Sequence, residues 1–254
     1  MHPLHHLICE YHTVHVKKHC TPLHNLLDQF SEIYPDRVES IAPNQHPNTH
    51  TNTTFITEIA QDRDSSMRKE VDSLLEIKIF TDRSAIDQKV GAEAVMYRRG
   101  KSTPSRVLRY HLGSTAEYTS FKAKAVGAIM GIWMIRSKHI AGHLLISVLT
   151  DSQAFIKQAG TCKATTAQYL IDNFMNIAEN INTTNIDPNT NQFHLAWISG
   201  HSRVKGNEKV DEEAKRAAQG DSSPWHTLPP ILRRQLPRSQ AALNQKHHED
   251  LKEK

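Results

Sequence analysis

The feature that most constrains the fold of this chain is an aspartate that directly follows an apolar, β-like segment, and it occurs twice. Residues 77–81 precede Asp82, and residues 144–150 precede Asp151. The second segment is almost wholly apolar, which is typical of a strand buried on both faces. Because the carboxyl ends of neighbouring parallel strands lie at one edge of a sheet, about 4.8 Å apart, we expect the two carboxylates to converge.

The rest of the central region alternates strand-like and helix-like segments. Strands are predicted at 77–81, 90–97, 107–112, 144–150 and 192–198, and helices at 116–136, 152–158, 165–181 and 207–219. A Gly-containing hairpin is predicted at residues 98–101, between the second and third strands. Three hairpin-linked strands followed by βαβ crossovers predict an α/β protein with a five-stranded mixed sheet and helices on both faces.

Composition divides the chain into three parts. Residues 1–72 are predicted to be a largely irregular, connector-like segment with short helices at 23–34 and 65–75, and a polar linker follows the first of these. Residues 73–220 are predicted to form the folded domain. Residues 221–254 begin as a Pro-rich linker and end in a charged stretch that could form a frayed helix.

Bulk properties limit the class of protein. The formal net charge is +4, which permits a polyanionic partner without requiring one. Three widely spaced cysteines suggest no disulfide framework and fit a reducing compartment. No apolar stretch is long enough to span a membrane and no secretory apolar segment is recognised, so an intracellular location, cytoplasmic or nuclear, is expected.

A third carboxylate and a histidine complete the candidate site. Asp211 is predicted near the start of the last helix, and His201 lies in the loop before it. Three oxygen ligands suit Mg²⁺ or Mn²⁺, and such sites serve phosphoryl transfer, in which one ion activates water and the other stabilises the leaving oxygen. His201 could move a proton or assist product release. The alternative for each aspartate is an ordinary turn or helix cap, with Asp151 capping the helix at 152.

These residues carry a resemblance to a known family. The motifs are Thr81-Asp82-x-Ser84, Thr150-Asp-Ser-Gln153 and Trp197-x-x-Gly-His201-x-x-x-x-Gly-Asn-Glu-x-x-Asp211. Over residues 76–220 the chain resembles the ribonuclease H family, in particular the domains that follow the reverse transcriptases of fungal non-LTR retrotransposons. The phrase Tyr110-His-Leu-Gly-Ser114 supports the latter resemblance. A reverse transcriptase encoded elsewhere is therefore an expected partner.

The resemblance implies that the RNA strand of an RNA–DNA hybrid is cleaved with two Mg²⁺ (or Mn²⁺) ions. Carried over by position, the metal ligands would be Asp82, Asp151 and Asp211, and His201 would be the loop histidine. The residues expected near nucleic acid are Ser84, Ser152, Gln153 and Asn207, although Asn207 is also a good N-cap for the last helix.

The sequence departs from the family at a fourth ligand. The phrase Phe121-Lys-Ala-Lys-Ala125 places Lys124 where the family has a glutamate, and neither Glu117 nor Glu93 offers an obvious replacement. Arg83 replaces a glycine beside the first aspartate. An ammonium cannot ligate a metal. We therefore weigh a weakly active ribonuclease against a non-catalytic nucleic-acid-binding remnant, in which Lys124 replaces the charge of the metal, and against a decayed product without function.

Two further groups remain open. Five cations on or near the predicted hairpin could contact phosphates or could simply be solvated: Arg98, Arg99, Lys101, Arg106 and Arg109. The N-terminal Cys and His residues could bind zinc, but their spacing matches no finger pattern, and a His-rich linker is the default interpretation: Cys9, His12, His15, His19 and Cys20.

Overall fold

The computed structural model of this chain describes residues 37–39, 41, 55–72, 75–136, 146–161, 165–184, 193–200 and 205–252, with side chains except at 67, 69–72, 182–184 and 205–208. The predicted N-terminal helix at 23–34 and the Cys- and His-containing segment at 9–20 lie outside these residues. The predicted polar linker at 43–54 and the loop around His201 lie outside them as well.

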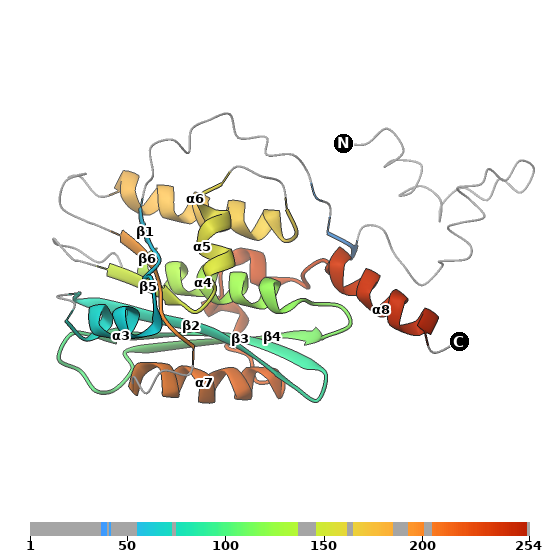
Figure 1. The fold of residues 1–254 in the computed structure, drawn as a ribbon, viewed down its shortest axis with the longest axis horizontal. Helices are drawn as coiled ribbons and strands as arrows, with labels where there is room; N and C mark the ends of the chain where they lie inside the picture. The colour runs from blue at the N-terminus through green and yellow to red at the C-terminus, as the bar shows by residue number, and fades with distance from the viewer. Residues whose placement is uncertain are drawn as a thin grey trace, which may run out of the picture.

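A single mixed sheet forms the centre of the molecule (Figure 1). Its strands are β1 (Ile56–Glu58), β2 (Ile77–Ile86), β3 (Lys89–Arg98), β4 (Arg106–Ser114), β5 (Ile146–Thr150) and β6 (Phe193–Trp197). They lie in the order β1-β6-β5-β2-β3-β4. The β2–β3 and β3–β4 pairs are antiparallel, whereas β2–β5, β5–β6 and β1–β6 are parallel. The predicted α/β architecture is confirmed, with six strands instead of the expected five.

Helices cover both faces of the sheet. They are α3 (Arg63–Asp72), α4 (Ser120–Arg136), α5 (Gln153–Ala159), α6 (Gln168–Thr184), α7 (Lys205–Ala218) and α8 (Gln240–Lys252), with 3₁₀ turns η3 (Trp225–Thr227) and η4 (Pro230–Arg233). In Figure 1, α7 lies on one face of the sheet and α4, α5 and α6 lie on the other, while α8 extends to one side.

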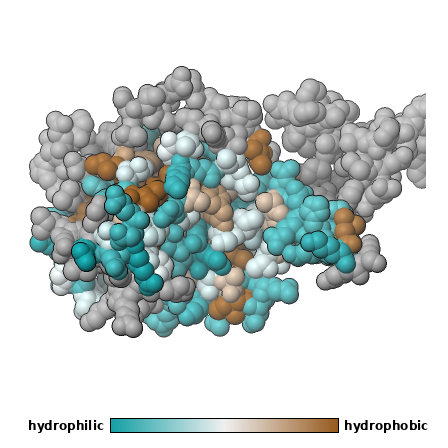
Figure 2. Space-filling view, viewed as in Figure 1, coloured by the Kyte–Doolittle hydropathy of each residue, from teal (hydrophilic) through white to brown (hydrophobic). Residues whose placement is uncertain are grey.

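Alternation along the strands divides the core between the two faces. Ile79, Val148 and Leu195 belong to the large cluster that includes α4 and α6. Their strand neighbours Phe80 and Leu149 belong to a smaller cluster with Val210 of α7. On the face drawn in Figure 2, hydrophobic residues form small groups separated by hydrophilic ones.

Two turns show why the hairpins differ in predictability. The β3–β4 connection contains Gly100 at φ +74°, as the glycine in the sequence indicated. The β2–β3 connection is the tight turn Asp87-Gln88, in which both residues have positive φ. It lacks the glycine that usually marks such a turn, so the sequence predicted a strand that ends too early, at residue 81 instead of Ile86.

Segments predicted to be irregular pack onto the domain at both of its ends. Phe55 is buried in the main core, and β1 extends the sheet at its edge. Residues 221–239, which we call the C-terminal strap, bury Leu228, Leu232 and Leu236 in the same core. The strap therefore differs from the linker that its prolines predicted, because leucines at intervals of four anchor it. The helix predicted in the charged tail is present as α8.

Candidate active site

The register of the sheet brings the first two aspartates together. Thr81 of β2 pairs with Thr150 of β5, so Asp82 and Asp151 each follow the last residue of the parallel ladder. Asp151 lies at the end of its strand, as expected. Asp82 does not, because β2 continues to Ile86 by pairing with β3. The two carboxylates therefore converge at the point where β5 ends, although β2 continues beyond it.

Two glycines fix α4 close to this point of the sheet. A Cβ on Gly127 would lie 3.1 Å from the carbonyl oxygen of Glu93 and 3.3 Å from that of Asp82. A Cβ on Gly131 would lie 3.2 Å from the side chains of Ile79 and Thr81. A Cβ at either position would make contacts tighter than ordinary van der Waals distance, so the glycines favour this close approach of α4 to the strands. The approach sets the position of Lys124, one turn before Gly127.

Lys124 points at Asp151 and binds it. Its Nζ lies 2.7 Å from each of the two carboxylate oxygens of Asp151. The two side chains are 17% and 21% exposed, so the ion pair is partly shielded from water. Lys124 therefore does not point into solvent.

Asp151 is also held from the side of β6. The indole of Trp197 donates a hydrogen bond to the backbone carbonyl of Asp151 at 3.1 Å. A Cβ on Gly200 would lie 3.3 Å from Oδ2 of Asp151, so the backbone there packs directly on the carboxylate. Trp197 is also partly buried against the main core. The Trp-x-x-Gly spacing was the signal that could have indicated its positioning role.

A fourth carboxylate lies beside Asp82 and was not assigned to the site from the sequence. Glu93 pairs with Asp82 across the β2–β3 ladder, so both side chains lie on the same face of the sheet. Glu93 is fully buried, and neither of its carboxyl oxygens has a hydrogen-bond partner among the described residues. Only the register of the hairpin shows this proximity, because Glu93 is otherwise a single acid in an apolar strand.

Both members of this pair resist ionisation. Burial, followed by the charge of Asp151, raises the pKa of Asp82 to about 6, against the opposing effects of the Arg83 amide and the Lys124 ammonium. Burial and then the charge of Asp82 raise the pKa of Glu93 well above its ordinary value of 4.5. The cluster thus holds more acid than the partly shielded Lys124 ammonium neutralises.

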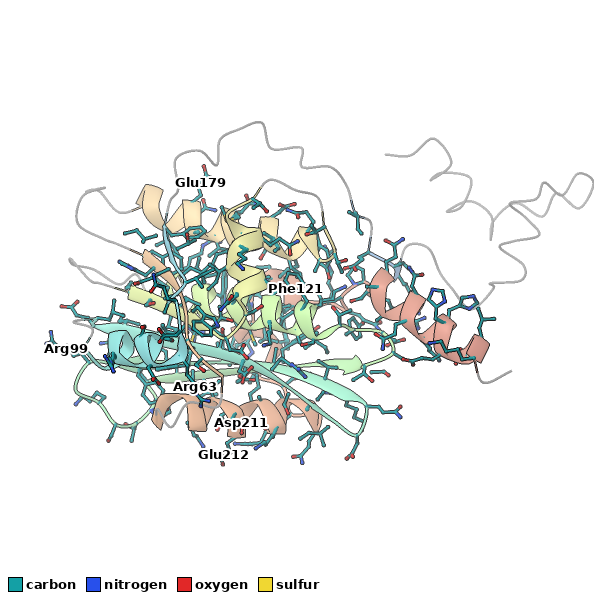
Figure 3. The ribbon with its side chains drawn as sticks, viewed as in Figure 1. Arg63, Arg99, Phe121, Glu179, Asp211 and Glu212 are labelled. Carbon is teal, nitrogen blue, oxygen red and sulfur yellow. The ribbon has the colours of Figure 1, made fainter. Side chains whose placement is uncertain are left out.

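The third predicted ligand, Asp211, lies on α7 (Figure 3). Its Oδ2 accepts a hydrogen bond from Lys215 Nζ at 2.7 Å, one turn further along the helix. Its neighbour Val210 belongs to the same core cluster as Phe80 of β2, which shares a face of the sheet with Asp82. The charge of Asp211 also raises the pKa of Glu93. Figure 3 also labels the neighbouring Glu212, whose side chain is exposed.

The residues predicted near nucleic acid are only partly described. Ser84 is half-buried on β2, and Gln153 begins α5. Ser152 is buried, and its hydroxyl accepts a hydrogen bond from the Phe155 amide, which makes it the N-cap of α5. The alternative that Asp151 caps this helix is therefore wrong. His201 and the side chain of Asn207 lie outside the described residues.

The predicted hairpin cations have different surroundings. Arg98, Arg99 and Lys101 are exposed at the tip of the β3–β4 hairpin. Arg109 instead forms ion pairs with Glu213 and Asp221, and so joins β4 to α7 and to the strap. The hairpin tip is free to meet a polyanion, whereas Arg109 is occupied within the fold.

Comparison with known proteins identifies the fold. A model of the RNase H family matches residues 75–219, more than half of the chain. The chain belongs to the ribonuclease H family. No curated protein matches it by sequence.

Several solved structures are similar to this ribonuclease H family member. The N-terminal RNase H domain of Rv2228c from Mycobacterium tuberculosis is 19% identical, covers 57% of this chain and 94% of its own, and has a TM-score of 0.42. LC11-RNase H1 in complex with an RNA/DNA hybrid is 17% identical, with coverages of 56% and 96% and a TM-score of 0.43. The foamy viral protease-reverse transcriptase, also in complex with a hybrid, is 15% identical, with coverages of 57% and 20% and a TM-score of 0.40.

Ribonuclease H family members generally use divalent metal ions, and the residues of this chain do not fit one as they are arranged. Lys124 binds both oxygens of Asp151, and Lys215 binds Asp211. Within the described residues no group of three or more His, Cys, Asp or Glu side chains is placed to hold a metal. No helix in the described ranges has the length and apolar character needed to cross a membrane.

Proposed function

We propose that this ribonuclease H family member binds RNA–DNA hybrids and that hydrolysis of the RNA strand is strongly impaired or absent. One contact supports the second part: Lys124 Nζ lies 2.7 Å from both carboxylate oxygens of Asp151. A divalent cation could use Asp151 only by displacing this ammonium, which has no lone pair to offer and repels positive charge. Lys124 would thus supply the charge that a metal ion supplies elsewhere in the family.

The proposed binding does not depend on a metal. A hybrid is recognised mainly through its phosphates and 2′-hydroxyl groups, with little sequence preference. The exposed cations at the hairpin tip, Arg98, Arg99 and Lys101, could contact phosphates. Ser84 and Gln153 are retained as the predicted contacts beside the carboxylate cluster.

A second candidate is a hybrid ribonuclease with low turnover. The observation that favours it is Glu93, which adds a buried, unpaired carboxylate next to Asp82. If a ligand could displace Lys124 from Asp151, four acids would remain in the cluster. This candidate makes the opposite prediction for cleavage by the unmodified protein.

Cleavage and binding of a labelled RNA–DNA hybrid separate the two candidates. We expect the wild type to bind the hybrid equally in EDTA and in Mg²⁺ and to cut it in neither Mg²⁺ nor Mn²⁺. Lys124→Glu should gain cleavage of at least about 100-fold over the wild type, because it restores a ligand and removes a repulsive charge. Lys157→Glu, which reverses an exposed charge on α5, is the matched control and should gain nothing.

The outcomes are distinct. Cleavage by the wild type that is abolished in Asp82→Asn would establish the low-turnover enzyme and reject impaired hydrolysis. Failure of the wild type to bind the hybrid would reject the binding function. If the wild type and Lys124→Glu both bind the hybrid and neither cleaves it, Lys124 is only one of several substitutions that prevent hydrolysis.

The retrotransposon origin belongs to this proposal. It is supported by the resemblance of phrases such as Tyr110-His-Leu-Gly-Ser114 to the domains that follow fungal non-LTR reverse transcriptases. A reverse transcriptase encoded elsewhere would then be a partner. Copurification of tagged chain with reverse transcriptase activity tests this, and activity no greater than in the untagged control would contradict it.

A further inference from the structure

The C-terminal strap exposes a large aromatic side chain outside the carboxylate cluster. Trp225 in η3 is 68% exposed, more than any other large hydrophobic residue among those the structure describes. A tryptophan side chain has a large apolar surface, and leaving it in water forgoes a substantial gain from burial. A single exposed tryptophan on a well-packed segment is therefore a candidate contact surface.

The strap holds Trp225 on a fixed backbone. Leu228, which follows η3, and Leu232, within η4, are buried in the main core. The amide of Thr227 donates to the carbonyl of Pro224 at 2.9 Å, and the indole of Trp133 on α4 donates to the carbonyl of Thr227 at 3.1 Å. A ligand that stacks on Trp225 would thus meet a preorganised platform and would not have to order a loop.

Guanidinium groups accompany the aromatic rings. Arg233 lies over the ring of Trp225, with 5.8 Å between its Cζ and the ring centroid, and donates to the carbonyls of Leu228 and His226 at 3.0 and 3.4 Å. Arg136 lies over the ring of Trp133 at 5.5 Å. Two aromatic–guanidinium pairs therefore occur on α4 and the strap, joined by the Trp133–Thr227 hydrogen bond.

The charge of this region is of one sign. Residues 222–248 contain Arg233, Arg234, Arg238 and Lys246 and no Asp or Glu. Arg238 is paired with Glu117, whereas Arg233 and Arg234 are exposed. Such an excess of cations favours an anionic partner, and a polyanion most of all, over a neutral protein segment.

We propose that Trp225 and Arg233, with the neighbouring Arg234 and Arg136, form a binding site for single-stranded nucleic acid. An unpaired base stacks on the exposed indole, and the guanidinium groups contact the adjacent phosphates. The site uses none of the carboxylate residues, so it adds a second nucleic-acid contact to the one proposed for the fold.

Fluorescence anisotropy of the full chain with a labelled 12-residue oligouridylate, and with the matching oligodeoxythymidylate, tests the site. Trp225→Ala should weaken binding about 10-fold, because stacking of one base contributes roughly 1 to 3 kcal/mol. Trp225→Phe should keep most of the affinity. Arg234→Ala should reduce the slope of log affinity against log salt by about 0.7, the value for one phosphate contact on a single strand.

The controls are Leu251→Ala, an exposed apolar residue on α8, and Arg68→Ala, an exposed arginine on α3. Both should bind as the wild type does, and all variants should melt at the wild-type temperature. Trp225→Ala should bind a duplex RNA–DNA hybrid as the wild type does, which separates this site from the proposed hybrid site. Equal affinity of Trp225→Ala and wild type, or no single-strand binding by the wild type, would overturn the proposal. Loss of self-association in Trp225→Ala with unchanged oligonucleotide binding would assign the surface to a protein contact instead.

Discussion

Two lysines on α4, separated by one residue, have different surroundings. Lys122 is fully buried, and its Nζ lies 3.1 Å from Oε2 of Glu39, whose side chain is 1% exposed. Lys124 is partly exposed and binds Asp151. The residue type, the helix and the presence of a carboxylate partner are the same. What differs is whether the carboxylates around each ammonium have their charge balanced and their hydrogen bonds complete.

The Lys122 site is balanced. The ammonium also donates to the carbonyl of Pro237 and lies 5.6 and 5.1 Å from the ring centroids of Tyr118 and Tyr169. The carboxylate of Glu39 accepts further hydrogen bonds from the amides of Ala167 and Gln240. One cation meets one anion, and the remaining hydrogen-bonding capacity of the anion is used.

The Lys124 site has a surplus of acid. Its ammonium binds Asp151, while Asp82 and the buried Glu93 lie nearby, and among the described residues no cation is bound to either of them. An ion pair that serves only to join segments of a fold has matched charges and complete hydrogen bonding. A surplus of buried acid costs stability and is tolerated where a site is meant to receive positive charge. The comparison indicates that Lys122 joins segments of the fold, whereas Lys124 lies in a carboxylate cluster suited to receive positive charge.

The largest effect should come from breaking the balanced pair. Lys122→Met leaves Glu39 as a buried charge without its cation, and we expect the free energy of unfolding to fall by roughly 3 to 5 kcal/mol. Urea unfolding measures this. The control is the double variant Lys122→Met with Glu39→Gln, which should lose less than the single variant. A loss below that of Lys124→Met would remove the distinction between the two sites.

An intermediate effect is expected at the second lysine. Lys124→Met leaves Asp151 without its cation beside Asp82 and Glu93. The Asp151 carboxylate is partly exposed and can be hydrated, and its neighbours can take up protons. We therefore expect a loss of roughly 2 kcal/mol in the same unfolding experiment. Combining Lys124→Met with Asp82→Asn should recover part of this loss, because it removes one of the repelling acids. No recovery would mean that the acids do not act on one another.

The smallest effect concerns pH. The pKa of Asp82 is raised to about 6, so the folded state binds a proton more tightly than the unfolded state, and stability falls as pH rises from about 4 towards 7. Between pH 5 and pH 7 the loss from this group should be roughly 1 kcal/mol. Asp82→Asn should lose less stability over that range than the wild type. The exposed control Asp250→Asn on α8 should follow the wild type, and identical pH profiles for all three would contradict the assignment.

Much of the fold followed from periodicity. The apolar segments before Asp82 and Asp151 predicted two neighbouring parallel strands, and the glycine at position 100 indicated the β3–β4 turn. The extra strand β1 was not predicted, because three residues carry too little pattern to distinguish a strand from a linker. The strap was missed because prolines dominated its composition, although its leucines recur every four residues.

The sequence by itself determined that two aspartates follow the strands of a parallel ladder, because strand periodicity is a local property. Its resemblance to the ribonuclease H family placed a lysine on the helix beside them. Only the tertiary structure decided which acid each lysine meets and that Glu93 is buried against Asp82. Those contacts join residues far apart in the chain. Their strength depends on desolvation and on the surrounding charges, which exist only after the sheet, α4 and the strap have packed together.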